Sequence, residues 1–310
     1  TLSHSSAASD VYKRQGKVFT AGGRRYTADV HGHSLSVYSG TGSRRTIAHD
    51  VVVRKIADIM GFAGLPGVAV EDANVFKCCI DSTARRRRYL QQLGSHTTGH
   101  GIRPDLSVPR HPFARSSVGP SQHQLYDVKT IGRTPTYHTP YRVQPADQRA
   151  RAVPGEYRRS AIQCDRTWNG TPPGTAGTFE AYLRSLPPVI GLGFGGYGEW
   201  SKEVDSLIGQ LAEIASAVPE RLGCCHGPAQ AQGQYAQWAR KHLHRESLRE
   251  VSRCRHAALD RLLLRPTETY AGDPDHCRMM DDSPNDPGVA NAWDSSDARG
   301  AYEDRPPRAA

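Results

Sequence analysis

The clearest periodic segment of the chain is residues 46–60, where apolar side chains recur every three or four positions. This spacing predicts a helix with one face in the core. Residues 201–217 repeat the pattern and predict a second core-facing helix. Residues 146–168 predict further helix, which is interrupted or restarted at the Pro154-Gly155 pair.

Five short segments predict strands, because they are apolar or alternate between apolar and polar residues. They are residues 67–70, 75–80, 102–108, 124–131 and 189–194. The alternation is cleanest in residues 124–131, where Asp127 and Lys129 share one face of the strand. Between the second and third strands, the arginines at residues 85–88 and the Gly-, His- and Thr-rich residues 94–101 predict exposed loop.

The predicted order is a helix, a run of short strands, a helix, a strand and a helix, which indicates an α/β domain with a mixed sheet flanked by helices. We expect this domain to span residues 16–217. Residues 218–265 predict a basic helical extension, with a separate amphipathic helix or helix pair from residue 234 onward. Residues 266–310 are rich in Pro, Gly, Asp and Ser and predict a disordered acidic tail.

Charge divides the chain into a basic body and an acidic end. The formal net charge is +9, and residues 272–310 carry nine acids against four arginines, so residues 1–271 carry +14. A basic body suits a polyanionic partner, because phosphate contacts by Arg and Lys supply most nonspecific affinity for nucleic acid. The alternative is compositional, since the chain has 33 Arg and 7 Lys and abundant arginine needs no binding function.

Cysteine content and hydropathy favour an intracellular protein without a membrane span. The seven cysteines include two adjacent pairs, which are poorly suited to a disulfide framework. No stretch approaches the roughly 18 apolar residues of a membrane span. We therefore expect an intracellular location, the nucleus if the source is a eukaryote, and no membrane partner.

Two acidic residues and a lysine carry the candidate chemistry. Pro104-Asp105 lies in one predicted strand and Asp127-Val128-Lys129 in another. Alternation places Asp127 and Lys129 about 7 Å apart along one face, and Asp105 meets them if its strand is a neighbour. Hydrolysis of a phosphodiester needs a divalent cation and a group that orients water, which two carboxylates and a lysine supply. The alternative is an exposed ion pair that contributes less than about 1 kcal/mol.

This arrangement resembles the PD-(D/E)xK, or restriction-endonuclease-like, nuclease superfamily, whose core also follows the order helix, strand hairpin, helix, strand. Among the seven lysines, only Lys129 has an acidic residue two positions before it. The resemblance implies a restriction-endonuclease-like mixed sheet flanked by helices, and cleavage of DNA that depends on Mg²⁺ or Mn²⁺. It also implies that Asp105 and Asp127 bind the metal ion, while Lys129 orients water and stabilises the developing charge.

Further residues are candidates for supporting roles. Glu156 is a candidate catalytic residue, with Tyr157 beside it, and the alternative for Glu156 is an ordinary first-turn acid that favours the helix dipole. Arg158 is a candidate contact for the nucleic-acid backbone. So are Arg85, Arg86, Arg87 and Arg88, although a solvated charge run is the commoner meaning of such a cluster.

The chain departs from the superfamily in two respects. Many members add an acid from the first helix, where this chain offers only Asp50 and Asp58. Thr130 is a poor match for the polar residue that many members carry after the lysine. Two functions therefore compete with a nuclease: a catalytically inactive nucleic-acid-binding or element-associated protein, and an interaction module whose basic helix binds an acidic protein.

A second and more local resemblance covers about residues 31–217. It is to an uncharacterised family of algal and protist genomes, some members of which lie beside reverse transcriptases in repetitive elements. The segments that carry it are residues 127–131 (DVKTI), 152–157 (AVPGEY), 170–174 (GTPPG) and 193–199 (GFGGYGE). The resemblance implies association with a mobile element, and it supports a nuclease only through the shared strand motif.

Two other motifs are not assigned a function. Gly191, Gly193 and Gly196 spell the dinucleotide fingerprint G-x-G-x-x-G, but no second strand with an acidic residue follows. A tight turn from strand to helix is the simpler interpretation. The adjacent Cys78 and Cys79 lack the two-residue spacing that a zinc site needs.

The start of the chain has a different character. Residues 5–15 resemble the conceptual translation of a sequencing-library adapter, and we exclude residues 1–15 from the expected fold. The resemblance implies that the natural N-terminus is missing, so the sequence offers no test for a signal peptide.

We predict that deleting residues 1–15 and 272–310 leaves thermal stability nearly unchanged, because neither segment is expected to pack on the core. The melting temperature of the trimmed protein is compared with that of the full chain by differential scanning calorimetry. A decrease of more than about 4 °C would show that one of the segments contributes to the core.

Overall fold

The computed structural model describes residues 18–21, 24–27, 44–94, 101–116, 121–131, 145–195, 198–218 and 227–264. All of them belong to one unit, which spans residues 1–266. The adapter-like opening and the tail from residue 266 lie outside the described residues, so their expected character stays a prediction. A two-stranded antiparallel hairpin of β1 (Val18–Ala21) and β2 (Arg24–Thr27) has no counterpart in the sequence analysis.

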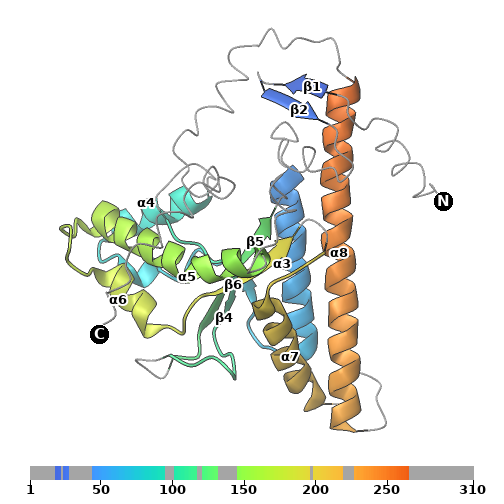
Figure 1. Ribbon diagram of the computed structural model, residues 1–310. Helices are drawn as coiled ribbons and strands as arrows, with labels where there is room; N and C mark the ends of the chain where they lie inside the picture. Colours follow the sequence, from blue (N-terminus) through green and yellow to red (C-terminus); the bar gives the residue numbers. More distant parts are fainter. Residues whose placement is uncertain are drawn as a thin grey trace, which may run out of the picture. The chain divides into compact units, whose positions relative to one another are not determined.

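A four-stranded mixed sheet forms the centre of the fold (Figure 1). Its strands are β3 (Ala69–Val70), β4 (Leu106–Val108), β5 (Gln124–Ile131) and β6 (Ile190–Gly195), in that order across the sheet. β4 runs antiparallel to both β3 and β5, and β6 is parallel to β5. The expected class, an α/β domain with a mixed sheet flanked by helices, is therefore confirmed.

On one face of the sheet, three helices share an apolar cluster with Tyr126 and Val128 of β5. They are α3 (Arg44–Ala63), α7 (Lys202–Ser216) and α8 (Pro228–Leu264). The first two confirm the core-facing helices that hydrophobic periodicity predicts. Their buried side chains follow the three- and four-residue spacing of one helix face.

The basic C-terminal segment forms one helix, α8, which is the first of the two expected alternatives, and this helix shares the apolar cluster of α3 and α7. Its buried residues Ala231, Tyr235, Ala239 and Leu243 recur every four positions and form a stripe that packs with α3 and α7. The Tyr235 hydroxyl donates a 2.6 Å hydrogen bond to the carbonyl oxygen of Ile59 in α3. The stripe consists of small and aromatic residues among many charges, which explains why periodicity alone did not assign it to the core.

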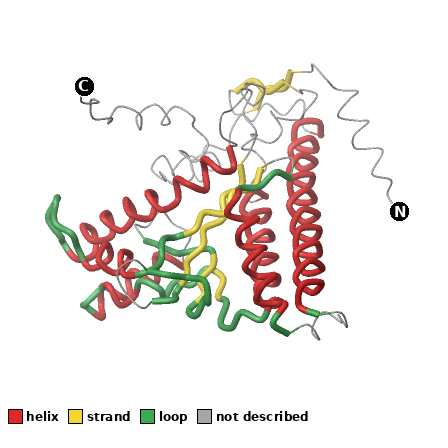
Figure 2. The backbone as a smooth tube through the Cα atoms, turned by 60° about the horizontal axis from the view of Figure 1, so that its bottom comes forward, coloured by secondary structure: helices red, strands yellow, loops and turns green. Residues whose placement is uncertain are grey.

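The other face of the sheet is covered by α5 (Pro145–Cys164) and α6 (Thr178–Ser185), together with α4 (Thr83–Gly94) (Figure 2). Their apolar cluster includes Leu125 of β5. The two faces of β5 thus enter two different cores, as the alternation of its side chains requires.

The expected break in α5 at Pro154 and Gly155 is wrong, because the helix continues through both residues. A stripe of buried side chains, which includes Ala150, Val153 and Tyr157, runs across the proline and holds the helix to the sheet. Tertiary packing therefore outweighs the cost of a proline inside the helix.

The expected exposed loop at residues 85–88 is also wrong, because the four arginines lie in α4. Tyr89 is fully buried, and Leu90 and Leu93 pack beside its cluster, so an apolar stripe follows the charge run. Arg86 donates hydrogen bonds of 3.2 and 2.7 Å from Nε and Nη2 to the carbonyl oxygen of Ile80, just before the helix.

The predicted strands on this side of the sheet are too long. Residues 102–108 form strand only at β4, and residues 67–70 only at β3. Residues 75–80 form turns and a short 3-10 helix (Lys77–Cys79) instead of a strand. Their buried side chains, Val75, Phe76, Cys79 and Ile80, follow helical spacing, which an apolar run does not distinguish from a strand.

The glycines of β6 are explained by the close approach of α5. A Cβ atom on Gly191 would lie 2.3 Å from the carbonyl oxygen of Ala150, and one on Gly193 would lie 2.3 Å from that of Ala146. These residues therefore allow helix and strand backbones to touch, which supports the interpretation that they are not a dinucleotide fingerprint. Gly196, the third residue of that motif, lies outside the described residues.

No helix in the described part of the chain combines the length and the apolar character that crossing a membrane requires.

We predict that Gly191→Ala destabilises the fold by about 1–3 kcal/mol, because the added methyl group forces α5 away from β6. The matched control is Gly209→Ala in α7, where an added Cβ meets no atom within 4 Å and alanine should gain about 0.5–1 kcal/mol. Free energies of unfolding are measured in urea. Equal effects of the two substitutions would contradict the close approach.

Candidate active site

Asp105 and Asp127 lie on neighbouring strands. Leu106, the first residue of β4, is paired with Tyr126 of β5 in antiparallel register. Asp105, one residue before β4, therefore lies beside Asp127 where the two strands separate. The register places the two residues side by side, as expected, and their carboxylates contact different partners. That both carboxylates hold one ion stays a prediction.

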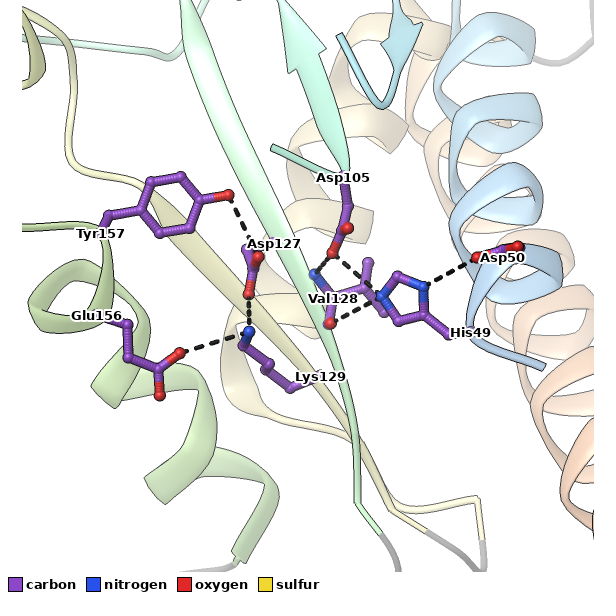
Figure 3. Close-up of polar contacts among 8 residues, drawn as sticks. All are labelled: His49, Asp50, Asp105, Asp127, Val128, Lys129, Glu156 and Tyr157. Carbon is purple, nitrogen blue, oxygen red and sulfur yellow. Dashed lines mark hydrogen bonds and ion pairs between the residues drawn. The ribbon is translucent and has the colours of Figure 1, made fainter. Parts of the chain in front are cut away.

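Asp127 forms an ion pair with Lys129 on the face of β5 that α5 covers (Figure 3). Lys129 Nζ lies 2.7 Å from Asp127 Oδ2 and 3.4 Å from Glu156 Oε2. The Tyr157 hydroxyl donates to Asp127 Oδ1 over 3.2 Å. Arg149 Nη1, two turns before Glu156 in α5, lies 3.1 Å from Glu156 Oε1. The strand thus supplies one acid and one base, and α5 supplies the residues that surround them.

Asp105 makes its own contacts with the strand backbone and with α3. The Val128 N–H donates to Asp105 Oδ2 over 2.6 Å, and His49 Nε2 lies 3.2 Å from the same oxygen. His49 Nε2 is also 3.2 Å from the carbonyl oxygen of Val128, and its Nδ1 is 3.3 Å from Asp50 Oδ1. Figure 3 shows Asp105 turned toward this histidine, with Asp127 turned toward Lys129.

Burial and like charges perturb the acid of the strand. Burial raises the pKa of Asp127, and the nearby carboxylates of Asp105 and Glu156 add to this effect. The ion pair with Lys129 lowers it again, and the balance is a pKa of about 6. A buried carboxylate among like charges is the environment in which an added cation is most strongly favoured.

The two bases at the site keep their protons at neutral pH. Burial by itself lowers the pKa of Lys129, but the charges of Asp127 and Glu156 outweigh it and hold the pKa above its ordinary value. Burial also lowers the pKa of His49. The hydrogen bond and charge of Asp105, with a contribution from Asp50, more than compensate and raise that pKa to about 9. Lys129 and His49 therefore act as cations.

His49 is the site residue that the sequence analysis missed, and it contacts Asp50, one of the two first-helix acids named there. A usable signal exists, because His49 precedes Val52, Val53 and Ile56 by three, four and seven positions and so lies on the inward stripe of α3. A polar residue on a core-facing stripe needs a partner inside the fold.

The candidate contacts for nucleic acid are placed as follows. The Arg158 side chain is 64% exposed, and its Nε lies 3.3 Å from Glu180 Oε1. Arg85 donates over 3.0 Å to the carbonyl oxygen of Trp168, and Arg86 caps Ile80 as described above. The other two members of the charge run, Arg87 and Arg88, are exposed.

Among the described residues, no group of three or more His, Cys, Asp and Glu side chains is arranged to hold a metal ion. Mg²⁺ needs fewer protein ligands, because one or two carboxylates suffice when water and phosphate oxygens complete its coordination shell. The carboxylates of Asp105 and Asp127 are the donors that such an ion would use. Burial, with the nearby carboxylates of Asp105 and Glu156, raises the pKa of Asp127.

Comparison of the chain with protein-family models, with curated proteins and with solved structures gives no match. The side-chain arrangement is therefore the basis of the functional argument.

We predict that His49 makes stability depend on pH. Its pKa rises from 6.5 to about 9 on folding, so its contribution is complete below pH 6.5 and is lost as the pH rises through about 9. Between these limits the free energy of unfolding of the parent should fall by about 2 kcal/mol more than that of His49→Gln. Urea unfolding at both pH values measures the difference.

The matched control for this prediction is His242→Gln, because the pKa of His242 lies below its ordinary value and the residue does not titrate in this range. This variant should keep the pH dependence of the parent. If the free energy of unfolding changed equally with pH in the parent and in His49→Gln, the assignment of a proton to His49 would be contradicted.

Proposed function

We propose that the protein hydrolyses phosphodiester bonds in nucleic acid, with DNA as the preferred substrate and Mg²⁺ or Mn²⁺ as the cofactor. The observation that carries the proposal is the buried Asp127 in contact with the half-buried Lys129, which also contacts Glu156, beside Asp105 at the junction of β4 and β5. The order of elements around it supports a restriction-endonuclease-like fold: helix α3, the antiparallel strands β3, β4 and β5 with α4 inserted after β3, helices α5 and α6, and the parallel strand β6.

Asp105 and Asp127 would hold the ion, which when bound neutralises phosphate charge and lowers the pKa of a bound water. Lys129 is suited to orient the attacking water and to stabilise the charge that develops on the phosphate, because its ammonium is retained at neutral pH. It does not serve as a general base in this state. Glu156 positions the ammonium through a contact of 3.4 Å.

His49 and Tyr157 hold the two acids in place. His49 and the Val128 N–H both contact Asp105 Oδ2, and Tyr157 donates to Asp127 Oδ1. Asp105 therefore has its Oδ2 engaged by the fold, and Asp127 has both oxygens engaged, because Lys129 contacts its Oδ2. These contacts limit the rotation of each carboxylate before a substrate binds. The net charge of +14 over residues 1–271 would attract the polyanionic substrate.

A second function, binding of nucleic acid without cleavage, is favoured by one observation. His49 already neutralises Asp105, and Lys129 already neutralises Asp127, so the pairs are electrostatically satisfied without an added ion. A protein that keeps the fold and the basic surface but not the reaction would look the same at these residues.

We predict that the full chain nicks supercoiled plasmid DNA in Mg²⁺ or Mn²⁺ and is inactive in EDTA. Asp127→Asn should lower the rate by about 100-fold or more, because it removes a charge that binds the ion, and Lys129→Met should have a similar effect. The matched control is Asp58→Asn on α3, whose carboxylate is 68% exposed and should leave the rate unchanged.

Nicking by Asp127→Asn at the parental rate would end the assignment of this site. Salt-sensitive DNA binding by the parent without nicking in either metal would establish the noncatalytic function in its place.

A further inference from the structure

A row of aromatic rings lies on the surface between α3 and α8. The ring centroids of Phe62 and Trp238 are 4.6 Å apart, and those of Trp238 and His242 are 4.9 Å apart. Phe62 is 44% exposed, and Trp238 and His242 are half-buried. We name these three residues the aromatic row. A large ring that remains this exposed beside two others presents a flat apolar surface to the solvent.

Packing of α3 against α8 does not require this exposure. Tyr235, fully buried, already joins the two helices through its hydroxyl and the Ile59 carbonyl. Phe62 is the penultimate residue of α3, and its ring contacts those of Tyr235 and Trp238 from outside. The outer face of the Phe62 ring stays exposed to solvent when α3 and α8 are packed together.

Cationic side chains flank the aromatic row. Lys241 and Arg245 lie three and seven positions after Trp238 and so share its face of α8. Lys55 lies seven positions before Phe62 on α3. Burial, and the charges of Arg245, Lys55 and Lys241, hold the pKa of His242 below its ordinary value, which places all three cations near the imidazole.

The cations outnumber the carboxylates in this region. Lys55 pairs with Asp58 over 3.3 Å, and Glu246 is shared by Arg245 at 3.6 Å and Arg249 at 3.0 Å. Four cations, with Lys241 included, thus meet two carboxylates. The surface carries a net positive charge next to flat apolar rings.

These two properties together select one kind of partner. A nucleic-acid duplex would use the cations but hides the faces of its bases, and an acidic protein would use the cations but has few flat rings to match the aromatic row. A single strand uses both, because its phosphates meet the cations and its unpaired bases stack on aromatic side chains. Stacking tolerates any sequence, because every base has a π-face.

We propose that the aromatic row and its flanking cations bind single-stranded nucleic acid. Bases stack on Phe62 and Trp238, and the adjacent phosphates contact Lys241 and Arg245. Phe62 is 13 positions from His49 along α3, or about 20 Å. The surface is therefore distinct from the candidate active site, and its binding function does not depend on the proposed cleavage.

The test measures binding by the full chain in EDTA, with a fluorescein-labelled 20-nucleotide DNA of mixed sequence, both single-stranded and as a duplex. Phe62→Ala should weaken single-strand binding by about 5- to 100-fold, as the loss of one stacked base requires, and should leave duplex binding unchanged. Phe62→Tyr should keep parental affinity. The matched control is Val70→Ala, which removes an apolar side chain of 40% exposure on β3.

A second variant tests the charges. Lys241→Gln combined with Arg245→Gln should reduce the slope of log affinity against log salt by about 1.4 for the single strand, which corresponds to two lost phosphate contacts. Arg166→Gln, an exposed arginine on the opposite side of the sheet, should leave the slope unchanged.

Three results would overturn the proposal. One is unchanged single-strand affinity in Phe62→Ala whose circular dichroism shows an intact fold. Another is an equal loss for the single strand and the duplex, which would leave only a general electrostatic effect. The third is a concentration-dependent mass for the parent that Phe62→Ala abolishes in light scattering, which would assign the aromatic row to contact with a second copy of the chain.

Discussion

The close approach of α5 to the sheet sets the geometry on which the candidate site depends. Gly191 and Gly193 carry no Cβ, so the first turns of α5 lie directly against β6. Because β6 is the parallel neighbour of β5, the same helix continues over β5 and brings its later residues to that strand. Glu156 and Tyr157 reach Lys129 and Asp127 for this reason. The glycines act on the site without touching it.

The cluster of charges at the site is poorly explained as a device for stability. Removing ions from water costs several kcal/mol each, and ion pairs formed in the interior offset this cost only in part. The chain nevertheless places an acid and a base together twice, once on β5 and once between α3 and the start of β4. Perturbed pKa values with a specific charge partner are typical of functional sites, which is why these residues carry the proposed function.

The sequence predicted the elements whose pattern is strong and local. The apolar stripes of α3 and α7 and the alternation of β5 were sufficient to place Asp127 and Lys129 on one face, and the Asp105 neighbourhood followed from strand order. The missed features depend on packing that no local pattern encodes. The inward stripe of α3 marks His49 as a residue that needs a partner, but the sequence does not identify that partner, because Asp105 and Val128 are more than fifty residues away.

Similar reasons explain the errors in the elements. The charge run of α4 looked like loop because its arginines outnumber the few apolar residues that anchor the helix, of which Tyr89 is the most buried. The 75–80 segment looked like a strand because an apolar run has no period, and β4 is short because the sheet pairs it over only three residues. In each case the local pattern left the conformation open, and contacts with residues distant in the sequence determined it.

The contact between Tyr235 and Ile59 also has a consequence for synthesis of the protein. The two residues are 176 positions apart, and ribosomes add about 5–20 residues per second. Synthesis of α8 therefore follows that of α3 by roughly 10–35 s. During that interval the nascent chain exposes the side of α3 that α8 later covers. Nascent chains on the same messenger RNA are therefore most prone to associate through this face until α8 has left the ribosome.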